Sequence, residues 1–468
     1  MSDQTLLHVA AAVPDADSEP IEDAGILIEG RSIASVGRFV DVRRAYPLAH
    51  ERDATDLVAL PGFVDAHSHG RGLPLAEQGV RHGPLELFLA QLTACTPLDP
   101  RDDAFVAGSD LLATGVTAVQ VFFHSHAPVD EYRAAVLATA DGLRASGIEY
   151  ELVIGFTDQQ EFVPPLSGEA PRGAEMLCSP ERGLDTDEFF AVYDALDASV
   201  TLGPVAPQWC SQPVWQGVAE RARGGARVHT HLLESAAQRA VLRPSPVETL
   251  RGFGVLGERF SAAHAVWLTD GEIGEVAAAR AALVHCPGSN RKLAGGAARV
   301  RAWLDAGVNV ALGLDSNARA DPPDVFDELR AARESARGEL RAREALRLAT
   351  LGGAYALGRA HIGRLARGYA ADVVALRAPA RTGDLVEALL ERATRNDVVE
   401  VWTNGELRVE DGRLLRQHDV DEARARLRAA LADDAEPRRQ RLAAVDALEP
   451  WLAEVWSLDA SQLAGAAR

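Results

Sequence analysis

Two histidines stand one residue apart in the segment Asp65-Ala66-His67-Ser68-His69. In an extended chain, residues i and i+2 point to the same side, so the imidazoles of His67 and His69 can bind one metal ion. Histidine pairs with this spacing also occur by chance in many proteins. The pair therefore becomes informative only if other ligands are brought to the same place.

Further ionisable residues follow three other apolar runs of β-like composition. These residues are His231 with Glu234, then His264, then Asp315. Each has an ordinary explanation when taken alone: a core histidine bonded to the backbone, or an aspartate that caps a helix. Whether these residues form one site depends on the helices and strands that position them.

Between about residues 85 and 350, apolar runs alternate with amphipathic helices rich in Ala, Leu and Arg. The candidate strands are 63–66, 116–122, 150–156, 200–205, 227–230, 260–265, 282–284 and 308–313. Helices are expected after them, for example at 130–146, 214–223, 271–279 and 325–337. This alternation favours a closed (β/α)8 TIM barrel of the α/β class over an open sheet.

The carboxyl ends of barrel strands meet at one mouth of the barrel. Enzymes built on this fold have their catalytic residues there. The first, fifth, sixth and eighth candidate strands all end in the polar residues described above. Three histidines and a carboxylate converging there make a catalytic metal site that leaves a position for water.

These segments also carry a family resemblance. The chain resembles the amidohydrolase superfamily, and within it the deaminase/chlorohydrolase branch that includes guanine, S-adenosylhomocysteine and triazine hydrolases. The resemblance rests on LPGFVDAHSH at 60–69, HLLE at 231–234, CPGSN at 286–290, GLDS at 313–316 and GRLARGYAAD at 363–372. In the fourth segment, Leu314 stands where the family has Thr.

The resemblance implies roles for individual residues. His67, His69, His231 and Asp315 would be the metal ligands, with Asp315 also taking a proton from water. Glu234 would pass a proton to a ring nitrogen, and His264 would bind the attacking water and the developing oxyanion or amino group. Zinc is the expected ion, with iron(II) as the alternative, because imidazole and carboxylate donors suit both.

The implied reaction is hydrolytic deamination of an aminated N-heterocycle of the purine, pterin, pyrimidine or triazine type. One alternative is a hydrolase of cyclic amides of the imidazolone type, since the same residues can open such rings. A second is a non-catalytic scaffold, which would be expected to have lost ligands that this chain keeps.

Residues that could contact the substrate lie in the neighbouring loops. His124 and His126 follow the second strand, Gln208 and Trp209 follow the fourth, and Arg71 and Gln78 lie in a glycine-rich loop that departs from the family pattern; each also has a structural explanation. His229 and His285 are expected to have structural roles.

The regions outside the barrel form two further parts. Residues 1–60 read as short strands with a hairpin turn at Gly30-Arg31 and no helix, and strands return after residue 360. Residues 1–60 and 360–415 are therefore expected to form one composite β-sandwich domain beside a barrel of residues 61–359. The tail, 416–468, is predicted to be a docked helix pair.

Composition excludes several classes of protein. The 468 residues carry a net charge of −20, which argues against a nucleic-acid partner. The four cysteines are widely spaced, and no signal peptide or membrane-spanning run is visible, so a cytoplasmic protein is expected. Relatives are commonly dimers, so a homodimer is the expected assembly.

Lysine is nearly absent, and Lys292 is its only representative. Many barrel amidohydrolases bridge two metals with a carboxylated lysine after the fourth strand. That segment here is Pro207-Gln208-Trp209-Cys210. A centre with a single metal ion is therefore expected.

Overall fold

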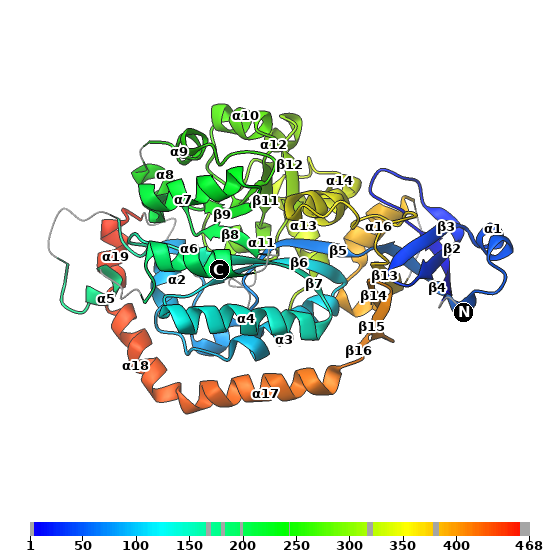
Figure 1. Ribbon diagram of the computed structural model, residues 1–468, viewed down its shortest axis with the longest axis horizontal. Coiled ribbons are helices and arrows are strands. Elements are labelled where there is room, and N and C mark those ends of the chain that lie inside the picture. Colours follow the sequence, from blue (N-terminus) through cyan, green and yellow to red (C-terminus); the bar gives the residue numbers. More distant parts are fainter. Residues whose placement is uncertain are drawn as a thin grey trace.

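The structure is a computed structural model that describes residues 4–164, 170–178, 183–196, 200–242, 244–315, 322–377 and 383–458. Two eight-stranded sheets organise it, one parallel and one mixed. The parallel sheet lies at the centre of the molecule and the mixed sheet at one end (Figure 1).

The parallel sheet is a barrel whose strands follow one another in chain order. Its strands are β5 (Phe63–Ser68), β6 (Val116–His124), β7 (Glu149–Phe156), β8 (Val200–Pro204), β9 (Val228–Leu232), β10 (Phe260–His264), β11 (Ala282–His285) and β12 (Asn309–Leu312). The barrel closes where the backbone N–H of Asp315 donates to the carbonyl of His67 at 2.9 Å. All six residues of β5 are buried, because a strand of a parallel barrel is covered on both faces. This explains why the predicted strands read as continuous apolar runs and not as alternating apolar and polar residues. The predicted barrel and its eight strands are confirmed.

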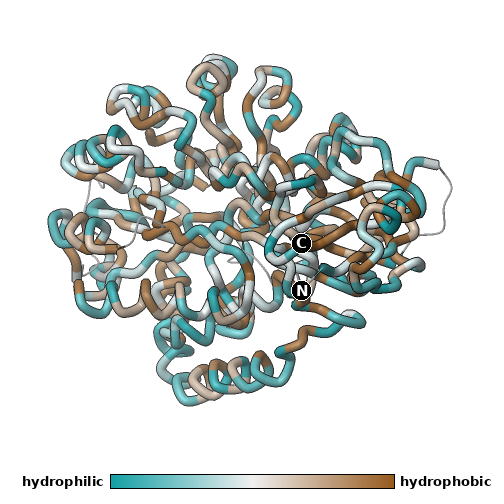
Figure 2. The backbone as a smooth tube through the Cα atoms, turned by 45° about the vertical axis from the view of Figure 1, so that its right-hand side comes forward, coloured by the Kyte–Doolittle hydropathy of each residue, from teal (hydrophilic) through white to brown (hydrophobic). Residues whose placement is uncertain are grey.

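Helices surround this barrel. They are α2 (Leu85–Leu92), α3 (Pro100–Leu112), α4 (Val129–Ser146), α5 (Glu175–Cys178), α6 (Thr186–Ala195), α7 (Gln212–Arg223), α8 (Ala236–Val241), α9 (Pro246–Phe253), α10 (Asp270–Ala278), α11 (Pro287–Lys292), α12 (Val300–Asp305), α13 (Val325–Ser335), α14 (Ala342–Arg347) and α15 (Gly353–Leu357). Short helical turns lie at η1 (Leu75–Gln78), η2 (Pro207–Trp209), η4 (Leu348–Gly352) and η5 (Arg395–Asp397). Side-chain caps start several of the helices: Asp99 accepts from the N–H of Asp102 at α3, and Thr269 caps α10. Figure 2 shows hydrophobic residues along the central strands.

The mixed sheet is built from the segments that precede and follow the barrel. Its strands are β1 (Gln4–Ala12), β2 (Ile21–Glu29), β3 (Ser32–Arg38), β4 (His50–Pro61), β13 (Val373–Arg377), β14 (Val398–Thr403), β15 (Glu406–Glu410) and β16 (Arg413–Leu414), and α16 (Leu385–Arg392) lies between β13 and β14. The antiparallel pair β4–β13 unites the N-terminal and C-terminal segments. The composite character of the β domain is thereby confirmed, although its strands form one continuous sheet.

One element of this region differs from the sequence prediction. Residues Phe39–Ala45 form helix α1, where no helix was expected. The helix has seven residues and buries only Val42, so it leaves no apolar period in the sequence.

The tail forms three helices, α17 (Gln417–Asp433), α18 (Ala435–Asp446) and α19 (Glu449–Val455), where a pair was predicted. Helix α17 runs along α3 (Figure 1) and buries Val420, Leu427 and Leu431 against a cluster that includes Phe105. Residues 459–468 of the predicted tail lie outside the described residues. Within the described part of the chain, no helix has the length and apolarity needed to cross a membrane.

Candidate metal centre and catalytic site

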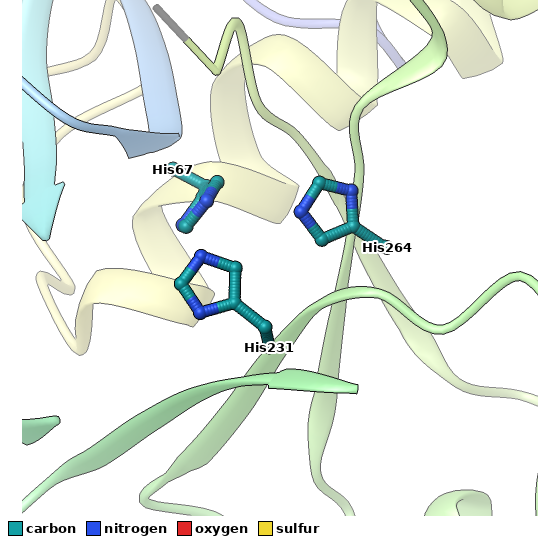
Figure 3. A group of neighbouring side chains, drawn as sticks. All are labelled: His67, His231 and His264. Atoms are coloured by element: carbon teal, nitrogen blue, oxygen red, sulfur yellow. The ribbon is translucent and has the colours of Figure 1, made fainter. Parts of the chain in front are cut away.

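Six side chains predicted from the sequence meet at the carboxyl ends of four barrel strands. They are His67, His69, His231, Glu234, His264 and Asp315, and all come from β5, β9, β10, β12 or the residues directly after them. One ligand atom each from His67, His69 and Asp315 lies within 4.8 Å of the other two, and so do atoms of His67, His231 and His264. Figure 3 shows the last three rings facing a common space.

His67 is held in place by a hydrogen-bonded chain. Its Nδ1 lies 2.8 Å from Nε2 of His229, and Nδ1 of His229 lies 2.7 Å from Oγ of Ser261. The remaining nitrogen of His67, Nε2, is buried and has no hydrogen-bond partner among the described residues. A histidine fixed through one nitrogen presents the other in a set direction, as metal-binding histidines do.

The three candidate histidine ligands are neutral. Burial lowers the pKa of His67 far below its ordinary range, the pKa of His69 to about 4 and that of His231 to about 3. His231 is also oriented, because its Nδ1 lies 2.8 Å from the carbonyl oxygen of Val205 and donates to it. Neutral imidazole is the form that binds metal ions.

Asp315 faces this group from the seam of the barrel. Its Oδ1 lies 3.4 Å from Nε2 of His69 and, among the described residues, accepts no hydrogen bond. Burial tends to raise the pKa of Asp315, but His69 and His264 together hold it below its ordinary value. The carboxylate is therefore ionised in a buried place that calls for a cation.

Glu234 and His264 form the other side of the site. Oε2 of Glu234 lies 3.6 Å from Nε2 of His264, which is 4.0 Å from Oδ2 of Asp315. Nδ1 of His264 lies 2.9 Å from the amide oxygen of Asn290, so the ring presents Nε2 to the two carboxyl groups. Burial raises the pKa of Glu234 to about 7, with His264 opposing the shift and Asp315 adding to it. Glu234 can therefore carry a proton at neutral pH.

The backbone at these positions is strained. Leu233, His264 and Asp315 have φ values of 44°, 68° and 43°, in the left-handed region that side chains other than glycine rarely adopt. Such conformations persist only where the surrounding structure imposes them, and they concentrate at functional sites.

A second buried carboxyl group supports the segment that carries Glu234. Ser235 Oγ donates to the carboxylate of Glu86, which comes from α2 and is 3% exposed. Ser235 also accepts from the N–H of Gln238 at 3.1 Å, and Gln238 Oε1 accepts from the N–H of Glu234 at 2.9 Å. Glu234 thus sits on a turn that is tied to a different part of the chain.

Comparisons with known proteins agree with this geometry. A family model described as "Amidohydrolase family" matches residues 58–408. The chain belongs to the amidohydrolase family. The resemblance drawn from the sequence motifs is confirmed.

Two curated relatives of this amidohydrolase are deaminases by name. A 5-methylthioadenosine/S-adenosylhomocysteine deaminase of Pelotomaculum thermopropionicum is 31% identical over 415 residues, which cover 84% of this chain and 90% of the relative. A 5'-deoxyadenosine deaminase of Methanosarcina mazei is 30% identical over 452 residues, 90% of this chain and 97% of the relative.

Solved structures show the same fold. An adenosine deaminase from Xanthomonas campestris with bound zinc has a TM-score of 0.76 and 25% identity, covering 91% of this chain and 98% of that one. An atrazine chlorohydrolase from Arthrobacter aurescens TC1, in complex with zinc, has a TM-score of 0.72 and 24% identity, covering 91% and 100%.

The residues of the amidohydrolase that were predicted to contact the substrate lie in separate parts of the structure. Arg71 lies 3.9 Å from Asp103 and lines a cavity of about 450 Å³ that none of the six clustered residues borders. Gln78 is 3% exposed, and its Oε1 accepts from the N–H of Thr96 at 2.8 Å. Both residues thus contact neighbouring loops and helices, and their binding roles stay predictions.

The other predicted contacts lie after β6 and β8. Trp209 is 7% exposed and packs with Phe122, whose ring lies 4.7 Å from that of His231. Both amide atoms of Gln208 are buried, and neither has a hydrogen-bond partner among the described residues. His124 and His126 lie together at the end of β6 with their rings 4.8 Å apart. Ser316 and Asn317, which follow Asp315, lie outside the described residues.

Sequence reasoning gave no role to Ser261, Glu86, Gln238 or Asn290. Asn290 belongs to the CPGSN motif, and that motif was the only signal that could have drawn attention to it. His285, expected to be structural, lies 3.0 Å from Ser335 Oγ, and burial lowers its pKa to about 3.

Proposed function

We propose that this amidohydrolase uses one divalent cation to deaminate an aminated N-heterocycle with water. The observation that carries the proposal is the pairing of a buried, protonatable Glu234 with His264 and Asp315 beside three neutral histidines. A hydrolytic deaminase needs a proton donor, a proton acceptor and an activated water within one small space, and this group supplies the protein's share.

The residues fit a metal ion. The buried Nε2 of His67 and Oδ1 of Asp315 have no hydrogen-bond partner among the described residues, and such atoms carry a cost unless something binds them. His67, His69, His231 and Asp315 would hold the ion, three nitrogens and one carboxylate being a common zinc donor set. When bound, a divalent ion supplies a Lewis acid that lowers the pKa of water from 15.7 to about 7.

The protein's own groups would move the protons. Asp315 accepts a proton from water, and His264 Nε2, 4.0 Å away, holds the water oxygen as it attacks the carbon that bears the amino group. Glu234 donates a proton to the adjacent ring nitrogen, which makes that carbon electrophilic. The amino group takes up the proton held by Asp315 and leaves as ammonia when the tetrahedral intermediate collapses. The remaining hydroxyl proton passes to Glu234, which restores its protonated form as the ring carbon becomes a carbonyl.

We further propose zinc as the ion, with one in this centre. The segment after β8 contains no lysine that could bridge two metals, and both zinc-bound structural neighbours share this fold. The relatives' names favour adenine nucleosides as substrates. A cytoplasmic location and a homodimer remain predictions.

Ammonia release tests the proposal. Zinc-loaded protein is incubated with 5'-deoxyadenosine, 5'-methylthioadenosine, S-adenosylhomocysteine, adenosine, guanine and a pterin, beside an imidazolone. Ammonia from at least one aminated ring, abolished by chelation and reduced at least about 100-fold by E234Q, is the expected result. Ring opening of the imidazolone with no ammonia from any aminated ring would favour the cyclic amide hydrolase instead.

A further inference from the structure

A second group of metal-binding residue types lies outside the six-residue cluster. His124 ends β6, His126 follows it, and Glu161 lies in the segment after β7. One ligand atom from each lies within 4.8 Å of the other two. Nε2 of His126 lies 3.3 Å from Oε1 of Glu161, and the two imidazole rings meet at an angle of 70°.

Local structure holds the backbone around each of the three donors. His124 pairs in register with Gly155 of β7, where a Cβ would come within 3.0 Å of the histidine Cβ. The carbonyl of His126 accepts from the N–H of Gly183 at 3.0 Å. The turn at Glu161 is shaped by Gln160, whose Oε1 accepts from the N–H of Phe162 at 3.0 Å.

The donor types of this second group suit a divalent cation. Glu161 is only 6% exposed, and an ionised carboxylate in such a place requires positive charge beside it. A protonated His126 alone could supply that charge. An ion pair of this kind does not require the second imidazole, whereas two nitrogens and one carboxylate are the three protein donors of an open zinc site.

The two groups are separate. His124 lies two residues beyond Phe122 on β6, about 6–7 Å further along the strand. Phe122 packs its ring against those of His67, His69 and His231, so the first set of donors lies beside Phe122 on this strand. Among the described residues, no group of three donors within 4.8 Å of one another combines members of both sets.

We propose that His124, His126 and Glu161 form a second site for a divalent cation of the zinc type, at the rim of the barrel mouth. Three protein donors leave coordination positions open for water or for an anionic group of a ligand. This site is independent of the proposed deamination, and it gives His124 and His126 a role other than direct contact with a heterocycle.

Zinc binding by the full chain tests the site. Protein stripped with a chelator is dialysed to equilibrium against buffered zinc, and bound metal is measured by mass spectrometry. The wild type should bind about two equivalents. E161Q and H126N should each bind about one, while H69N, altered in the first centre, should keep the equivalent at the rim.

H418N is the matched control, because His418 forms a similar pair with Glu422 at 3.2 Å on the exposed face of α17. Among the described residues, this pair belongs to no group of three possible metal ligands. It should still bind about two equivalents. A wild type that saturates at one equivalent, or an E161Q protein that still binds two, overturns the proposal. Near-ultraviolet circular dichroism of each variant separates loss of the site from loss of the fold. Because H69N and E161Q remove different equivalents, failure of one site is distinguishable from failure of the other.

Discussion

The barrel mouth and helix α17 use the same kinds of side chain in opposite ways. At the mouth, Glu234 and Asp315 are buried and face histidines, and their pKa values depart from the ordinary range. Along α17, exposed arginines pair with carboxylates of the barrel helices: Arg426 donates to Asp102 through two nitrogens, at 2.6 and 2.8 Å. Burying charged groups next to one another costs desolvation free energy, which a bound ion or substrate can offset. Solvent-exposed pairs contribute little to stability.

The largest effect is expected from Asp315. D315N removes a candidate ligand and the proposed proton acceptor together, so turnover should fall on the order of 10,000-fold or more. Steady-state kinetics and metal content measure the two losses side by side. Full metal content with normal turnover would contradict the proposed roles of Asp315 as ligand and proton acceptor.

A smaller loss is expected from Glu234. Because E234Q keeps the volume and removes only the transferable proton, kcat should fall by about 100- to 10,000-fold while bound metal stays at the wild-type level. Metal analysis of the same preparation is the control. Loss of metal together with activity would instead make Glu234 a ligand.

The hydrogen-bonded series His67–His229–Ser261 tests whether a candidate ligand at the mouth depends on its supporting contacts. H229Q should weaken metal binding in the first centre by about 10- to 100-fold, because supporting hydrogen bonds orient the ligand. Competition with a chromophoric chelator measures the change. H285Q is the matched control, since His285 is equally buried but hydrogen-bonds to Ser335, and equal weakening by both variants would remove His229 from the supporting role.

Asp372 tests whether burial alone shifts the pKa of a carboxyl group, away from the histidines of the barrel mouth. It lies 2% exposed beside the mixed sheet, accepts from the N–H of Asn404 at 2.8 Å, and burial raises its pKa to about 7. A carboxyl whose folded pKa is raised stabilises the fold below its unfolded pKa of 3.8, and that stability is lost as the pH rises towards 7. D372N, which keeps the acceptor oxygen, should therefore gain up to about 4 kcal/mol over the wild type between pH 4 and pH 8.

Urea unfolding at both pH values measures this difference for Asp372. The same stability difference between wild type and variant at pH 4 and pH 8 would show that this carboxyl group does not titrate between them.

The smallest effect is expected on α17. R426A should change the free energy of unfolding by less than about 1 kcal/mol, because Arg426 is 57% exposed and solvent screens its pair with Asp102. L427A, at a neighbouring residue that is 1% exposed, should cost about 2–5 kcal/mol. Denaturant unfolding compares them, and an equal cost for both would break the contrast between the two regions.

The sequence predicted the barrel and the group at its mouth because both depend on local patterns. His67, His69, His231 and Asp315 each follow an apolar strand, and parallel strands must end at the same edge. Glu86 and Ser261 could not be found in this way, since their roles depend on hydrogen bonds between segments far apart in the chain. Helix α1 was missed for a different reason: one buried residue leaves no periodic signal.

The seam of the barrel joins the first candidate ligands to the last. Asp315 follows β12, His67 lies on β5, and the backbone hydrogen bond between them closes the sheet. During synthesis, a ribosome that has not yet released residue 315 exposes at most three histidines of the first centre. The complete ligand set and the closed sheet therefore arise together, so uptake of the first ion can report on closure of the barrel in the newly made chain.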